Sequence, residues 1–95
     1  MDFVEIRFDG TFLVDRDDVE EGLNESLKGI GEVTGAGSGE FGAHLDVEVG
    51  DDFPKNDVLD KVFAVLKNLE IGDAARVRPG DGERWIRLSE WRFDE

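Results

Sequence analysis

The chain has 95 residues, of which 39% are hydrophobic and 37% charged, and this suits a single domain over residues 1–95 with one modest core. Its formal net charge of −13 repels nucleic acid and anionic membranes, so we expect a basic protein partner and neither nucleic-acid nor membrane binding. The chain has no cysteine and no apolar run of the roughly 18–20 residues that cross a bilayer, which excludes disulfides and thiolate chemistry and favours a cytoplasmic location.

The negative charge is concentrated in the first part of the chain. Residues 1–57 contain 16 acidic and 4 basic side chains, whereas residues 58–95 contain 8 and 7. Two explanations remain open. The acidic residues either serve a basic partner or keep the surface of a salt-adapted protein well solvated.

The first elements are a strand and a helix. Apolar and polar residues alternate over 4–8, which is typical of a half-buried strand. Apolar residues then recur at helical spacing over 19–30, with Asp15 as the expected N-cap. Gly29 and Gly31 are expected to end this helix.

The middle of the chain predicts two strands separated by glycines. Residues 32–34 indicate a short strand, and residues 44–49 alternate between polar and apolar side chains as a longer one. The glycine-rich segment 35–39 either cradles a phosphate or forms the bend between these strands. A cradle needs a following helix and a nearby cation, but the chain has neither Lys nor Arg between Lys28 and Lys55. We therefore expect a bend or bulge, with a loop that takes shape against a partner as the alternative.

The second half predicts a helix and two strands. Apolar residues over 58–69 indicate a helix that ends before Gly72, Val77 lies in a strand, and residues 85–88 form its partner strand. The order strand–helix–strand–strand–helix–strand predicts an α+β fold, namely a ferredoxin-like βαββαβ sandwich with an additional C-terminal strand. Both helices should cover one face of the sheet, over a core that includes Ile6, Leu23, Leu27, Val47, Leu59, Val62, Phe63, Leu66 and Val77.

No motif for metal binding or catalysis is found. His44, Asp46 and Glu48 share one strand face, but positions i, i+2 and i+4 span roughly 13 Å, too far for three ligands on one ion. The single histidine offers few ways to activate a serine nucleophile. We therefore expect no metal, no cofactor and no enzymatic activity.

The C-terminal stretch 75–95 contains five of the seven arginines and both tryptophans. If Ile86 and Leu88 face the core, then Trp85 and Arg87 face outward, and both residue types are common in interfaces. Alternatively, the arginines pair with nearby acidic residues and the tryptophans cover the end of the core.

Three segments are distributed along the chain: VEIRFDG, GEVTGAGSGEFGAHLDVEV, and DVLDKVFAVLKNL followed by an arginine-containing strand. Together with the short length, the glycine-rich hairpin and the acidic strand, they resemble the small acidic immunity proteins of bacterial polymorphic-toxin and contact-dependent inhibition systems. The resemblance implies a cytoplasmic bacterial protein that binds and blocks a cognate toxin domain. It implies no particular inhibitory residue.

Two functions are therefore expected from different classes. The first is an immunity protein that neutralises a basic toxin domain through an acidic surface. The alternative is a small ferredoxin-like regulatory domain, dimeric, that binds a metabolite. A homodimer is compatible with both. The candidate partner-binding residues are Glu40, His44, Asp46, Glu48, Asp51, Asp52, Trp85 and Arg87.

Overall fold

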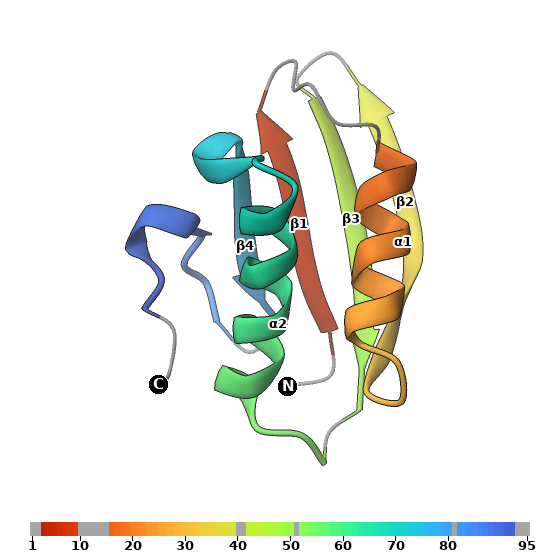
Figure 1. Cartoon of the computed structure of the whole chain (residues 1–95). Coiled ribbons are helices and arrows are strands. Elements are labelled where there is room, and N and C mark those ends of the chain that lie inside the picture. Colours follow the sequence, from red (N-terminus) through yellow and green to blue (C-terminus); the bar gives the residue numbers. More distant parts are fainter. Residues whose placement is uncertain (1–2, 10–15, 40–41, 51, 81, 93–95) are drawn as a thin grey trace.

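Figure 1 shows the computed structural model of the chain, which describes residues 3–9, 16–39, 42–50, 52–80 and 82–92. The strands are β1 (Phe3–Asp9), β2 (Gly31–Gly39), β3 (Gly42–Val49), β4 (Ala75–Pro79) and β5 (Ile86–Arg87). The helices are α1 (Arg16–Ser26) and α2 (Lys55–Asn68), with two short 3₁₀ helices, η1 (Gly72–Ala74) and η2 (Leu88–Glu90).

The strands form one antiparallel sheet in the order β2-β3-β1-β4-β5. β1, α1 and β2 form a unit into which β3 is inserted, and β3, α2 and β4 form a second unit into which β1 is inserted. This interleaving is the split βαβ arrangement, so the predicted ferredoxin-like α+β fold is confirmed. The predicted additional strand is β5, which lies beyond β4 and extends the four-stranded order.

Both helices cover the same face of the sheet, as expected (Figure 1). The apolar residues of β1 and β3 alternate toward this face, and α2 places six buried side chains above them. All of these side chains belong to one core cluster. That cluster includes every residue predicted for the core: Ile6, Leu23, Leu27, Val47, Leu59, Val62, Phe63, Leu66 and Val77.

The first helix is shorter than the sequence predicts. It ends at Ser26, and the next residues form a turn in which Leu27 is still buried. Gly29 has a φ of +82°, the left-handed conformation that favours glycine, and the N–H of Gly31 donates to the carbonyl of Leu27 at 2.8 Å. The expected N-cap, Asp15, lies outside the described residues.

The glycine-rich segment belongs to a strand, which corrects the prediction of a bend at 35–39; of the two predicted forms, only a bulge is present, at the start of the segment. β2 pairs with β3 along its length, with one irregularity between Val33 and Gly35. Neither Gly35 nor Gly37 has a positive φ. The glycines therefore do not turn the chain, and the connection between the two strands falls at residues 40–41, outside the described residues.

The last predicted strand is also shorter than expected. Only Ile86 and Arg87 pair with β4, and Leu88 begins η2 instead of continuing the strand. Local hydrogen bonds favour this turn, because Glu90 Oε1 accepts the N–H of Arg87 at 3.1 Å. Among the described residues, neither helix has the length and apolar character needed to span a membrane.

Candidate functional site

The face of the sheet opposite the helices carries His44, Asp46, Glu48 and Trp85 of the predicted site residues. We call it the open face. Cross-strand pairing and the alternation of buried residues assign its side chains. The open face comprises Phe3, Glu5, Arg7, Glu32, His44, Asp46, Glu48, Arg76, Arg78 and Trp85.

One half of the open face is acidic. His44, Asp46 and Glu48 alternate along β3 with fully or nearly fully buried apolar residues, so they share this face as the sequence predicts. Glu32 of β2 is paired with Glu48 and adds a further carboxylate. This half therefore presents carboxylates to a cationic group of a partner.

The glycines of β2 make room for the side chains of this acidic half. Gly35 is paired with Asp46, and Gly37 is paired with His44. A Cβ atom on Gly35 would lie 3.0 Å from Asp46 Oδ2, and one on Gly37 would clash with the ring of His44. The side chains of Asp46 and His44 thus extend over the bare backbone of β2.

The other half of the open face is basic, which is unexpected for so acidic a chain. The guanidinium groups of Arg7, Arg76 and Arg78 lie 5.2, 5.8 and 5.7 Å from the centre of the Trp85 ring. These distances are within the range of cation–π attraction. Trp85 is half-buried and forms the centre of this basic cluster.

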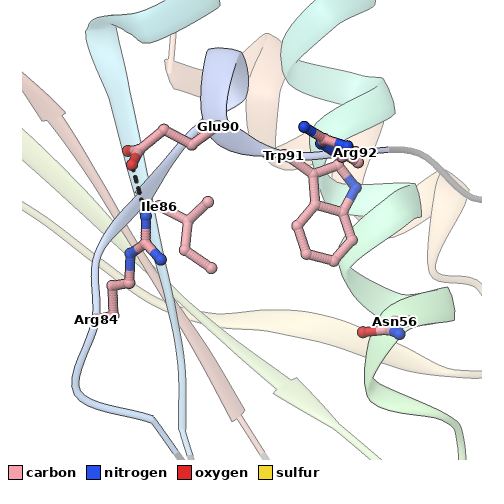
Figure 2. A pocket seen from close by; sticks show the side chains of 6 residues that line it. All are labelled: Asn56, Arg84, Ile86, Glu90, Trp91 and Arg92. Atoms are coloured by element: carbon pink, nitrogen blue, oxygen red, sulfur yellow. Dashed lines mark hydrogen bonds and ion pairs between the residues drawn. The ribbon is translucent and has the colours of Figure 1, made fainter.

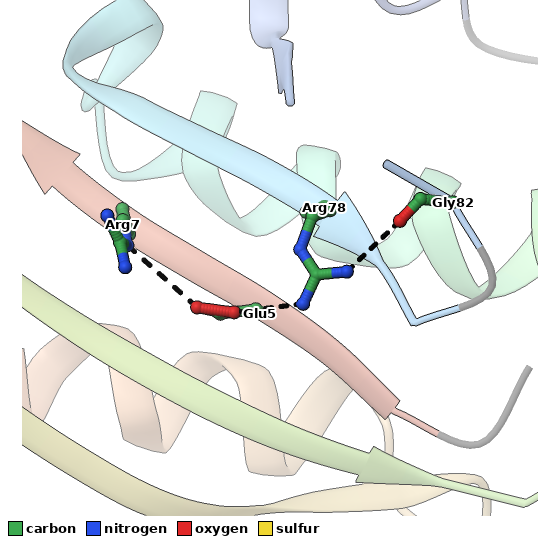
Figure 3. A network of polar contacts seen from close by, with 4 residues as sticks. All are labelled: Glu5, Arg7, Arg78 and Gly82. Carbon is green, nitrogen blue, oxygen red and sulfur yellow. Dashed lines mark hydrogen bonds and ion pairs between the residues drawn. The ribbon is translucent and has the colours of Figure 1, made fainter. Parts of the chain in front are cut away.

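Glu5 lies on β1, between the two halves. Figure 3 shows its carboxylate between two arginines, with Arg78 Nη2 at 3.1 Å and Arg7 Nε at 3.8 Å. Arg78 also donates from Nη1 to the carbonyl of Gly82 at 3.0 Å, which fixes its guanidinium plane. Because Arg78 donates to both Glu5 and Gly82, its guanidinium is held in one position relative to β1.

The strand register places the charges in rows across the sheet. Asp46, Glu5 and Arg78 form one row, because Glu5 is paired with both of the other residues. His44, Arg7 and Arg76 form the next row in the same way. The charge therefore changes sign across β1 in the first row, whereas the second row carries positive charges on β1 and β4.

The predicted site residues are only partly brought together. Asp52 is exposed in the turn before α2, and Trp85 lies in the basic half of the open face. Arg87 is paired with Arg76 of the open face, but its guanidinium donates to the backbone carbonyl of Asp73 in η1. Glu40 and Asp51 lie outside the described residues.

Sequence reasoning missed Phe3, Glu5 and Glu32 of the open face and the three arginines of its basic half, Arg7, Arg76 and Arg78. The signal was present in the alternation of the segment ARVRP over Ala75–Pro79, which places both of its arginines opposite the buried positions. The missing step was the strand order. Only the pairing of β1 with β4 brings Arg7 beside these two arginines.

The second tryptophan covers the core, as in the alternative explanation of the C-terminal stretch. Trp91 stacks on Phe63 with ring centres 5.0 Å apart, and its Nε1 donates to Asp60 Oδ1 at 2.8 Å. Beside it lies a hollow of about 320 Å³ (Figure 2). Its rim includes an ion pair between Arg84 Nη2 and Glu90 Oε2 at 2.8 Å.

Two carboxyl groups near η2 have lowered pKa values. Hydrogen bonds from Ser89, with the N–H of Ser89 2.9 Å from Asp73 Oδ1, lower the pKa of Asp73. The backbone N–H of Arg87 and the guanidinium of Arg84 lower the pKa of Glu90. These carboxylates attach η2 to η1 and to the preceding loop, so we assign them a structural role.

The open face offers hydrogen bonds, ion pairs and cation–π contacts to a partner. Among the described residues, no three His, Cys, Asp or Glu side chains cluster in a way that could hold a metal ion. Comparisons with protein-family models, with curated proteins and with solved structures found no match. We therefore infer the function of the open face from the contacts and charges of its own residues.

Proposed function

We propose that this protein is an immunity-type inhibitor that binds a basic toxin domain through the acidic half of its open face. The observation that carries the proposal is the alignment of His44, Asp46 and Glu48 along β3, on the face of the sheet opposite α1 and α2. These side chains lie beside a glycine-rich strand, so a partner can approach them closely. The net charge of −13 supports a basic partner.

The proposed complex would form in two stages. The excess of negative charge would first steer a basic partner toward the protein, with association rates up to ~10⁸–10⁹ M⁻¹s⁻¹ at low salt. Carboxylates of β3 would then become desolvated against lysine or arginine side chains of the toxin. Losing one member of a buried charge pair costs roughly 2–5 kcal/mol, because the other charge is left without a partner.

The test uses, as the binding partner, the product of a reading frame that neighbours the gene of this chain and encodes a toxin domain. We expect the double variant Asp46→Lys with Glu48→Lys to weaken the complex by at least about 30-fold, mainly through faster dissociation. Surface-plasmon kinetics measures both rates. A growth-rescue assay in cells that express the toxin measures neutralisation.

The matched control is Glu20→Lys with Glu21→Lys on α1. It changes the net charge by the same amount, but on the helix side of the molecule. Rescue that survives the β3 changes and is lost with the α1 changes would reassign the binding surface. If no neighbouring product binds the wild-type protein, the metabolite-binding regulatory domain becomes the better function.

A further inference from the structure

We propose that the open face is self-complementary and binds a second copy of this chain, forming a weak two-fold dimer with the two sheets face to face. The charge balance of the open face differs from that of the whole chain. Its described side chains include four carboxylates, from Glu5, Glu32, Asp46 and Glu48. It also carries the three guanidinium groups of Arg7, Arg76 and Arg78, although the whole chain has a charge of −13. The open face is thus nearly neutral on a strongly negative molecule.

Carboxylates and arginines occupy separate parts of the open face, and this separation determines which partner surface is complementary in charge. The carboxylates of β2 and β3 lie on one side of β1, and the arginines of β4 lie on the other. A complementary surface must have the opposite arrangement. A second copy has this arrangement when it is turned over about a two-fold axis parallel to β1, because each acidic half then faces a basic half.

The strand register predicts a specific contact. Asp46 and Arg78 occupy equivalent positions on either side of Glu5 in one row. The two-fold rotation therefore places Asp46 opposite Arg78 of the second copy, and the same contact occurs twice. Arg78 uses two N–H groups within its own chain, so its guanidinium has further donors for this carboxylate.

The residues of β1 would face their own copies near the axis. Phe3 is 39% exposed, so it gains an apolar contact with the second Phe3. Glu5 meets its counterpart, but its charge is already paired with Arg7 and Arg78 of its own chain. Arg7 also meets its counterpart, but its Nε lies 3.8 Å from Glu5 Oε1 of its own chain. The central strip therefore adds apolar burial, and its Glu5 and Arg7 charges compensate each other within each chain.

The size of the face sets the expected strength. A sheet that is seven residues long, as β1 is, and five strands wide covers roughly 23 by 20 Å, or about 450 Å². A standard stable interface buries about 800 Å² on each partner, so this dimer belongs to the weak, transient class. We expect a dissociation constant between about 10 μM and 1 mM.

The experiment is sedimentation equilibrium at fixed ionic strength with protein up to about 1 mM, the range in which such a constant is measured. Asp46→Arg is the decisive variant. It makes the chain less negative and should strengthen self-association if only the overall charge matters. The proposed contact predicts the opposite, at least a 10-fold weaker dimer, because two arginines then face each other in both contacts. Glu21→Arg on α1 is the matched control and should not weaken the dimer.

The double variant Asp46→Arg with Arg78→Asp completes the test. It keeps the wild-type net charge and restores opposite signs across the interface, so dimerisation should return to within about 3-fold of wild type. In this variant Glu5 keeps Arg7 as a partner, and the arginine introduced at position 46 is its neighbour in the row. Circular dichroism checks that each variant folds, and Asp46→Lys replaces Asp46→Arg if the latter does not.

Three results would overturn the proposal. They are a wild-type protein that stays monomeric throughout the concentration range, equal effects of Asp46→Arg and Glu21→Arg, and a double variant that fails to recover. The inference does not rest on the proposed inhibitor function, since the experiment contains no toxin. It uses the same face, however, so a dimer and a toxin complex would exclude each other.

Discussion

Gly37 shows how a single residue can determine which side chain fits at the paired position of the neighbouring strand. It is paired with His44, and a Cβ atom at this position would clash with the histidine ring. The backbone itself does not require glycine, because the φ of Gly37 is negative. The glycine is therefore needed for the side chain across from it and not for a turn. His44 is exposed, so its ring has solvent to move into.

Gly37→Ala should consequently have an effect that depends on residue 44. In a His44→Ala background we expect stabilisation by about 0.4–1 kcal/mol, because alanine reduces the conformational freedom of the unfolded chain. With His44 present the gain should be smaller, since the ring must turn away from β2. Urea unfolding of the wild-type protein, the two single variants and the double variant gives the change in the free energy of unfolding caused by Gly37→Ala in each background. Equal effects in the two backgrounds would contradict the close approach of Gly37 and His44.

At the scale of elements, the helix α2 and the strand β2 show what a sequence can and cannot predict. The apolar spacing over 58–69 located α2 because helical burial repeats within one segment. β2 has few apolar side chains, and its pairing with β3 depends on the space that Gly35 and Gly37 leave for the opposite strand. Local patterns carry no signal for such a cross-strand fit. The alternation along β3 did predict which side chains share the open face.

The 3₁₀ helix η2 is held partly by carboxylates, and its attachment should depend on pH. Hydrogen bonds from Ser89 lower the pKa of Asp73 below its ordinary value of 3.8. A lowered pKa in the folded state means that the ionised carboxylate stabilises this contact above pH 3.8, and that the stabilisation is lost as the pH falls through the lowered pKa. We expect the Ser89 amide resonance to titrate with a midpoint below 3.8.

Asp73→Asn is the matched control for this titration. Its side-chain oxygen can still accept the hydrogen bond from Ser89, but it has no proton to gain in this range. The titration of the Ser89 amide should therefore disappear, while the fold at neutral pH is retained. A midpoint at or above 3.8 in the wild-type protein would show that this hydrogen bond does not favour the ionised form.

At the scale of the whole molecule, the strand order, and not the position of a residue in the sequence, determines which charges lie together on the open face. The uneven distribution between residues 1–57 and 58–95 suggested an acidic N-terminal surface. In the structure, β4 comes from the second segment and pairs with β1 from the first, so the open face combines both. Its acidic half could be predicted from the alternation along β3. Its basic half could not, because it depends on long-range strand order.

The size of the molecule predicts how salt should act on the proposed toxin complex. The chain measures 35 × 26 × 25 Å, and α1, which contains Glu20 and Glu21, lies on the face of the sheet opposite the open face. The Debye length is about 30 Å at 0.01 M salt and about 8 Å at 0.15 M. Charges on α1 therefore reach a partner at the open face only in dilute salt. Carboxylates in direct contact with the partner act at both salt concentrations.

We therefore expect the two double variants to respond differently to salt. Glu20→Lys with Glu21→Lys should slow association at about 0.01 M salt and have almost no effect at about 0.15 M. Asp46→Lys with Glu48→Lys should speed dissociation at both concentrations, because the contacts it removes are not separated from the partner by solvent. Stopped-flow or surface-plasmon kinetics at the two salt concentrations measures each rate. A β3 effect that vanishes in 0.15 M salt along with the α1 effect would mean that β3 only steers the partner and does not contact it.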